Sequence, residues 1–165
     1  MLSVEDVYHT GFVVPDIEKA MAEFAALFDL AWTPVEEVAT PVRTPQGSLT
    51  APLRFTYSRG PTPRIELLEP VPGTVWEQPV QPVAGPSSAH HVGVWCDDFR
   101  ATSAALDAAG SPCVLTFDDG SGGPVRFAYH RLPNGALVEL IDATRRPALE
   151  EWFAGGPYPA AAPGA

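Results

Sequence analysis

The stretch His90-His91-Val92-Gly93-Val94-Trp95-Cys96-Asp97-Asp98 repeats a pattern that the chain has already used as Tyr8-His9-Thr10-Gly11-Phe12-Val13-Val14-Pro15-Asp16. A His, a Gly and an Asp recur in it, each 82 residues after its first appearance. Residues that recur at one constant spacing indicate an internal duplication. We therefore expect the fold to consist of two copies of one module, with the second copy beginning at this stretch.

The first copy has the pattern of one strand, one helix and three further strands. Residues 7–14 alternate as a half-buried strand does, and Pro15-Asp16 then ends the strand and supplies Asp16 as a helix N-cap. Apolar residues recur at three-and-four spacing after this cap, which predicts a helix over 17–28. Turn-forming residues separate the segments that follow, and strands are predicted at 32–39, 49–58 and 64–69.

The second copy repeats this order, with a strand at 90–96, a helix at 99–109, and strands at 112–117, 125–131 and 137–142. The letters repeat as well. Arg54-Phe55-Thr56-Tyr57 returns as Arg126-Phe127-Ala128-Tyr129, and Ile65-Glu66-Leu67-Leu68 returns as Val138-Glu139-Leu140-Ile141. The sequence therefore predicts an α+β fold built from two βαβββ modules that pair through their sheets.

Both modules are expected to share one structural domain, because a lone unit of about 60 residues buries too little surface to be comfortably stable. At 165 residues the chain is long enough for one common core. The expected division is a first module over 1–70, a proline-rich connector over 71–89, a second module over 90–145, and a short helix with a flexible tail over 146–165.

Composition and charge exclude several kinds of partner. The chain has 10 Lys and Arg against 20 Asp and Glu, and its net charge of -10 would repel a phosphate backbone or an anionic membrane surface. It shows no basic and apolar N-terminal signal and no run of about 18 apolar residues. Cys96 and Cys113 have no C-x-x-C spacing and predict neither a disulfide framework nor a zinc knuckle. We expect a cytoplasmic protein that binds neither nucleic acid nor membranes.

Side-chain alternation along the strands predicts which residues face the interior of the sheet. Glu66 and Glu139 lie on the face opposite their apolar neighbours, which are the natural partners of the helices, and so are expected on the concave face. By the same count, the helix side receives Phe55, Tyr57, Phe127 and Tyr129, and the concave side receives Arg54, Thr56, Ser58, Arg126 and His130.

One His and one Glu of each module occupy equivalent positions in the duplication. Neutral imidazole nitrogens and carboxylate oxygens are ligands for hard and borderline divalent metals, and four of them leave two octahedral positions for substrate or water. A single His or Glu in a strand is more often structural or solvated, but the coincidence of four in a duplicated pattern favours a metal site. The predicted ligands are His9, Glu66, His91 and Glu139.

These residues resemble those of the vicinal oxygen chelate superfamily, which includes glyoxalase I, methylmalonyl-CoA epimerase, extradiol dioxygenases and bleomycin-resistance proteins. The resemblance covers about residues 5–145 and rests on His9 with Val14-Pro15-Asp16, Arg64 to Pro70, Ala89 to Val94, and Pro133 to Ile141. It implies paired βαβββ modules whose eight strands curl around a metal ion, with His9, Glu66, His91 and Glu139 as ligands and His90 only as a neighbour. The same resemblance suggests a homodimer.

The ligand set and the spacing point to one branch of this superfamily. Its dioxygenases use two His and one Glu and lack a ligand at the position of Glu66, and its bleomycin-binding members have lost all the ligands. The 24 residues between Glu66 and His91 resemble the long connector of the epimerases, which suggests that one chain supplies a complete site. However, Leu49 to Leu53 contains no acid where the epimerases place a catalytic Glu, and this argues against a true methylmalonyl-CoA epimerase. The resemblance is nearest to the glyoxalase I and methylmalonyl-CoA epimerase-like branch.

The resulting hypothesis is a metal-dependent, non-redox isomerase, epimerase or lyase that acts on a small organic or acyl-thioester substrate. One divalent ion, Zn, Ni, Co, Mn or Fe, would polarise a carbonyl group while a base removes the neighbouring proton. The candidate bases are Glu139, Glu66 and His130. An Fe(II)-dependent dioxygenase and a metal-independent protein that binds a small molecule such as an antibiotic are the alternatives.

Five further residues are candidates for substrate binding. Arg54 and Arg126 suit an anionic group such as a carboxylate, with structural ion pairs as an equal alternative. Trp76, Trp95 and Phe117 are expected to shape an apolar pocket.

Overall fold

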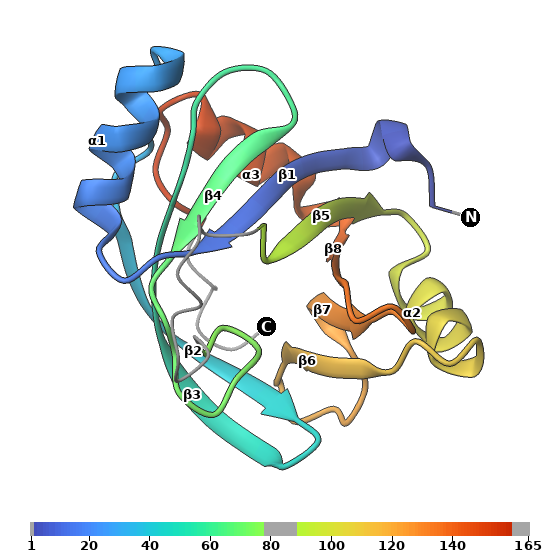
Figure 1. The fold of residues 1–165 in the computed structure, drawn as a ribbon. Helices are drawn as coiled ribbons and strands as arrows, with labels where there is room; N and C mark the ends of the chain where they lie inside the picture. Colours follow the sequence, from blue (N-terminus) through green and yellow to red (C-terminus); the bar gives the residue numbers. More distant parts are fainter. Residues whose placement is uncertain (1, 78–88, 160–165) are drawn as a thin grey trace.

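Two copies of one βαβββ module form the fold, which the computed structural model describes for residues 2–77 and 89–159 (Figure 1). The first module contains β1 (Val7–Val13), α1 (Ile17–Phe28), β2 (Glu36–Thr44), β3 (Gly47–Tyr57) and β4 (Arg64–Leu68). The second contains β5 (His91–Cys96), α2 (Phe99–Ala108), β6 (Cys113–Phe117), β7 (Val125–Arg131) and β8 (Leu137–Asp142). Short 3-10 turns at Val4–Asp6 and Ala143–Arg145 precede β1 and the last helix, α3 (Arg146–Phe153).

The eight strands close into a curled sheet in the order β1-β4-β3-β2-β6-β7-β8-β5. Within each module the first strand pairs in parallel with the last, β1 with β4 and β5 with β8, while the other pairs are antiparallel. The modules join through the antiparallel pairs β1–β5 and β2–β6, so the two halves of the sheet are arranged alike. The predicted α+β fold of two paired βαβββ modules is confirmed.

The helices α1 and α2 cover the outer face of the sheet, on opposite sides of the molecule (Figure 1). On α1, Ile17 and Ala20 are buried against Leu67 of β4. On α2, Phe99 is buried with Leu140 of β8. These contacts leave the inner face of both halves free for other side chains. Among the described residues, no helix has the length and apolar composition that crossing a membrane requires.

The local predictions hold for α1 and its cap, but the second strand lies later than expected. The Asp16 carboxylate accepts a 2.9 Å hydrogen bond from the backbone N–H of Lys19, a cap that contributes about 1 kcal/mol. The strand predicted over 32–39 is β2, Glu36–Thr44. The prediction ended it before Pro41, whereas the β2–β3 hairpin stays paired up to its turn. Residues 78–88 of the predicted connector and 160–165 of the predicted tail lie outside the described residues.

The predicted faces of β3 and β7 are wrong, except at Arg126, which lies on the concave side as predicted. Tyr57 pairs with Glu66 across β3 and β4, and Tyr129 pairs with Glu139 across β7 and β8. Directly paired residues point to the same side of a sheet, so both tyrosines lie on the concave face with the glutamates. Alternation within one strand does not give this register, because a slip of one residue exchanges the two faces. The observed register places Phe55 and Phe127 inward, and Thr56 and His130 outward.

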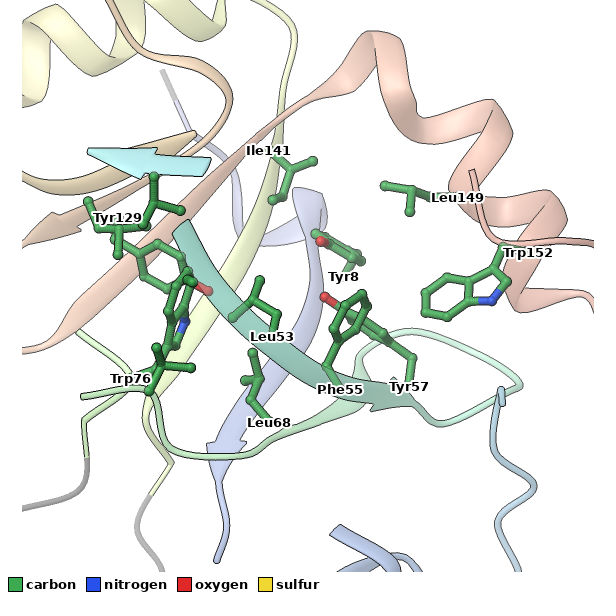
Figure 2. Packing of buried hydrophobic residues seen from close by; sticks show 14 of the residues in the cluster. Tyr8, Leu53, Phe55, Tyr57, Leu68, Trp76, Tyr129, Ile141, Leu149 and Trp152 are labelled. Atoms are coloured by element: carbon green, nitrogen blue, oxygen red, sulfur yellow. The ribbon is translucent and has the colours of Figure 1, made fainter. Parts of the chain in front are cut away.

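The concave side of the sheet holds the largest group of buried apolar residues, many of them aromatic (Figure 2). Trp152 of α3 stands edge-on to Phe55 and Tyr57 of β3, with ring centroids 6.0 and 5.6 Å apart. Trp76, from the start of the connector, stands edge-on to Tyr129 at 5.5 Å. The segment that follows each module therefore folds back over the inner face and completes its apolar lining.

Candidate metal centre

The four predicted ligands come together where the first and last strands of both modules lie side by side. β1 carries His9, β4 carries Glu66, β5 carries His91 and β8 carries Glu139, and all four side chains are buried. One ligand atom from each lies within 4.8 Å of the others. We refer to these four residues as the cluster. A single chain supplies all of it, one His and one Glu from each module.

The separations of the donor atoms suit one shared ion. His9 Nε2 lies 2.9 Å from His91 Nε2, 3.2 Å from Glu66 Oε2 and 3.3 Å from Glu139 Oε2. Ligands about 2.1 Å from one ion lie about 3.0–3.4 Å apart at octahedral or tetrahedral angles. Among the described residues, Glu66 Oε2 and Glu139 Oε2 are buried and accept no well-directed hydrogen bond. Two such oxygens facing two imidazole nitrogens fit a divalent cation.

The ring orientation of His91 is set by its neighbour His90. His90 Nε2 lies 2.6 Å from the carbonyl oxygen of Val75, which can only accept, so this nitrogen carries a proton. Burial, and then the charge of His91, lower the pKa of His90 and favour its neutral form. Its Nδ1 is then an acceptor, and it lies 2.9 Å from His91 Nδ1, which must donate. When His91 gives up its second proton, the lone pair is therefore left on Nε2, the atom that faces the cluster.

The charges of the cluster keep its carboxylates ionised. Burial by itself raises the pKa of Glu66, but the two histidines outweigh it and hold this pKa well below its ordinary value. Burial likewise lowers the pKa of His91, but the close carboxylates of Glu139 and Glu66 and their negative charges prevail and raise it to about 9. Metal ligands must be deprotonated, so a cation that binds here at neutral pH takes the place of a proton on His91.

Three tyrosines that the sequence reasoning did not select surround the cluster. Tyr129 Oη lies 3.4 Å from His91 Nε2. The rings of Tyr8 and Tyr57 stand edge-on to His9, with centroids 4.3 and 5.3 Å away. Tyr8 points inward beside its neighbour His9 because the β1–β5 register shifts between residues 7 and 9.

All three phenols stay protonated in this environment. Burial, followed by the negative charges of the two glutamates of the cluster, raises the pKa of each tyrosine well above its ordinary value. They are therefore neutral O–H donors beside the candidate ligands. The sequence carried a signal for two of them, because Tyr57 and Tyr129 both end the repeated Phe-x-Tyr pattern, each opposite a cluster glutamate.

A pocket of about 350 Å³ opens beside the cluster, and Glu66 and Glu139 form part of its wall. This volume is within the range of small-molecule sites, about 300–1,000 Å³. The remaining wall is largely apolar and comes from strands of both modules and from α3. Among the described residues, its aromatic lining comes from Tyr8, Phe55, Tyr57, Trp76, Phe117, Phe127, Tyr129, Trp152 and Tyr158.

Of the predicted catalytic and binding residues outside the cluster, Arg126, Trp76 and Phe117 line this pocket. Trp95 does not line it. Instead it stacks on Tyr8 with ring centroids 4.0 Å apart, so it supports the wall from behind.

The inward orientation predicted for His130 and Arg54 is wrong. His130 Nδ1 donates to the carbonyl oxygen of Ser111 at 2.8 Å, and its Nε2 lies 2.9 Å from Ser103 Oγ on α2, so the ring is held between the sheet and this helix. The guanidinium of Arg54 pairs with carboxylates on the outer side of the first module, those of Glu18, Glu37 and Glu69. Neither side chain reaches the pocket, so His130 has no position from which to act as a base there.

Comparison with solved structures finds the same fold. The chain is similar to methylmalonyl-CoA epimerase from Mycobacterium tuberculosis, with 17% identity over 90% of this chain and 97% of that one and a TM-score of 0.55. It is also similar to a Streptomyces coelicolor methylmalonyl-CoA epimerase variant in complex with 2-nitronate-propionyl-CoA. The identity is 17% over 87% of this chain and 96% of that one, and the TM-score is 0.58. A hypothetical protein from Bacillus halodurans is 16% identical over 82% of this chain and 92% of that one, with a TM-score of 0.54. Among curated proteins, none has a significantly similar sequence.

Comparison with protein-family models identifies the superfamily. The model described as Glyoxalase/Bleomycin resistance protein/Dioxygenase superfamily matches residues 8–129, which is most of the chain. The matched part includes three of the four cluster residues, His9, Glu66 and His91. The resemblance that the sequence motifs indicated is thereby confirmed, and the chain belongs to the glyoxalase, bleomycin-resistance protein and dioxygenase superfamily.

Proposed function

We propose that the protein is a metal-dependent enzyme that moves a proton next to a carbonyl group, in an isomerase, epimerase or lyase reaction without net redox change. The observation that carries the proposal is the buried His9, Glu66, His91 and Glu139 cluster in the wall of an apolar pocket. Zn, Ni, Co, Mn and Fe all accept two imidazole nitrogens and two carboxylate oxygens. When bound, such an ion supplies a Lewis acid for the carbonyl oxygen of the substrate.

Two kinds of residue in this chain suit the proton transfer. Glu139 and Glu66 are the candidate bases, because both are ionised and both form part of the pocket wall. Tyr57 and Tyr129 offer neutral O–H groups on the same face, which stabilise negative charge that develops on a substrate oxygen. The aromatic wall keeps water away from the carbanion that proton removal creates.

The proposal is tested on the full chain after removal of metal. Titration with Zn²⁺, Ni²⁺, Co²⁺, Mn²⁺ and Fe²⁺ in turn should give one tightly bound ion per chain, measured by equilibrium dialysis and elemental analysis. The loaded protein should then exchange the α-hydrogen of a thioester probe, S-(2-phenylpropanoyl)-N-acetylcysteamine, for deuterium in D₂O, both with and without oxygen. If the chain binds none of the five ions, the proposal is wrong. Oxygen consumption that requires Fe²⁺ would instead support the dioxygenase.

His90→Phe is expected to weaken metal binding by about 10–100-fold, the usual effect of losing the hydrogen-bond partner of a ligating histidine. The ring of Phe has a similar shape but cannot accept the proton of His91 Nδ1, so His91 loses its fixed tautomer. His90→Gln, whose amide can both accept from His91 and donate to Val75, should keep most of the affinity. The measurement is competition with a chelator, combined with nitrogen NMR shifts of His91. Equal affinity in both variants contradicts this role.

A further inference from the structure

The pocket wall contains two arginines without a carboxylate partner. Among the described residues, neither Arg126 nor Arg145 has an ion pair within 4.0 Å, although the chain carries twice as many acidic as basic groups. The guanidinium of Arg126 lies over the ring of Phe117, 4.1 Å from its centroid. Arg145 and Tyr158 both line the pocket, and the positive charge of Arg145 acts on the Tyr158 phenol. By contrast, Arg43, Arg54 and Arg64 each pair with a carboxylate, and the partner of Arg43 is Asp118, which also lines the pocket.

The backbone at Arg126 directs this side chain into the pocket. The register of β6 and β7 shifts between residues 116 and 117, and Arg126 has a φ of 62°, in the left-handed region that non-glycine residues seldom adopt. As a result both Arg126 and its neighbour Phe127 line the pocket, which simple alternation would forbid. Strained backbone of this kind is concentrated at ligand sites.

The two positive charges act on each other. Burial, and then the charge of Arg145, lower the pKa of Arg126 from its ordinary value. The charge of Asp119 acts in the opposite direction but does not outweigh burial and the charge of Arg145, so a bound anion beside the two guanidinium groups would relieve their repulsion. Planar guanidinium groups bind carboxylates through paired, charge-assisted hydrogen bonds.

The remainder of the pocket suits an apolar and aromatic body. Figure 2 shows Phe55, Tyr57 and Trp152 on one side of the interior, with Tyr129 and Trp76 on the other. Flat apolar ligands gain both burial and edge-on or stacked ring contacts in such surroundings. At about 350 Å³ the pocket is at the small end of the usual range, which suits a small molecule.

We infer that the substrate is a small organic carboxylate with an apolar, aromatic body, whose carboxylate binds Arg126 and Arg145 while its reacting end lies at the cluster. The inference rests on the proposed function, because it takes the cluster as the reacting end of the site. A carboxylate fits better than a phosphate, since Asp118 and Asp119 also line the pocket and would repel a second negative charge.

The test uses 4-phenylbutanoate as the probe and its neutral counterpart 4-phenylbutanol. Trp76 and Trp152 line the pocket, so tryptophan fluorescence of the full chain reports binding. The acid should bind at least about tenfold more tightly than the alcohol, and each of Arg126→Gln and Arg145→Gln should remove at least about tenfold of that affinity. Arg131→Gln is the matched control, because this arginine lies on the same strand but is exposed and outside the pocket.

Three results overturn the inference: equal binding of the acid and the alcohol, unchanged affinity in both arginine variants, or tighter binding of phenyl phosphate than of the acid. The titrations are made with and without added Zn²⁺. A chain that binds the acid through both arginines but takes up no metal contradicts the proposed function and leaves the carboxylate subsite standing. A chain that binds metal but shows no preference for the acid contradicts the carboxylate subsite and leaves the proposed function standing.

Discussion

Replacement of His91 by Ala is expected to reduce the affinity of the chain for a divalent metal ion by more than a hundredfold. His91 Nε2 lies 3.0 Å from Glu66 Oε2 and 3.6 Å from Glu139 Oε2, so its removal takes one of four donors from the cluster. Loss of an outer hydrogen-bond partner of a ligand already costs about 10–100-fold in affinity, and loss of the ligand itself must cost more. Any activity that depends on the ion should disappear with it.

The matched control for this variant is His130→Ala. His130 is as deeply buried as His91 but lies on the other face of the sheet, against α2. Its loss leaves the carbonyl of Ser111 without a donor and should reduce the free energy of unfolding by about 1–3 kcal/mol, with metal affinity unchanged. Chelator competition and thermal unfolding of both variants separate the two effects. If His91→Ala binds metal as tightly as His130→Ala, the metal centre and the proposed function are both wrong.

The duplication made the cluster predictable, and this depends on how its residues are encoded. Each ligand repeats in the sequence, and each sits on a first or last strand of a module, where a recurring polar residue stands out among apolar neighbours. Alternation then gave the correct face for Glu66 and Glu139, because their apolar neighbours pack under α1 and α2. No pairing information was needed for these four residues.

The rest of the pocket depends on contacts between distant parts of the chain, and these the sequence pattern does not contain. The faces of β3 and β7 follow from their pairing with β4 and β8, which is why Tyr57, Tyr129 and His130 were placed on the wrong sides. Arg126 reaches the pocket only through an irregular strand pairing. Arg145 and Trp152 reach it because the C-terminal segment folds back over the sheet, and a short amphipathic helix does not reveal where it will pack.

The recurring glycine of the two motifs has a steric role that the pattern alone left unexplained. In the β1–β5 pair, His9 lies opposite Gly93 and His91 lies opposite Gly11. A Cβ built at Gly93 would be 1.8 Å from His9 Cε1, and one at Gly11 would be 1.9 Å from His91 Cε1. Each module therefore supplies a histidine to the cluster and the empty space that the histidine of the other module occupies.

Gly93→Ala is therefore expected to lower metal affinity by at least about a hundredfold, although Gly93 supplies no ligand. The added methyl group occupies the position of the His9 ring, so either the ring leaves the cluster or β1 and β5 separate, and such overpacking typically costs about 1–3 kcal/mol of stability. Gly123→Ala is the control, because a Cβ there meets nothing within 4 Å and its backbone is not left-handed. Gly123→Ala should leave the metal affinity and the stability of the chain unchanged.

A double variant separates the steric effect from a general loss of folding. If the methyl group of Gly93→Ala acts through the His9 ring, removal of that ring makes the space available again, so His9→Ala with Gly93→Ala should recover the stability that Gly93→Ala loses. Its metal affinity should stay as low as that of His9→Ala, because the ligand is absent. Thermal unfolding and chelator competition across the four proteins of this cycle give the coupling between the two sites. Additive stability losses, or a Gly93→Ala variant that binds metal like the parent chain, contradict the assignment of Gly93 as the space for His9.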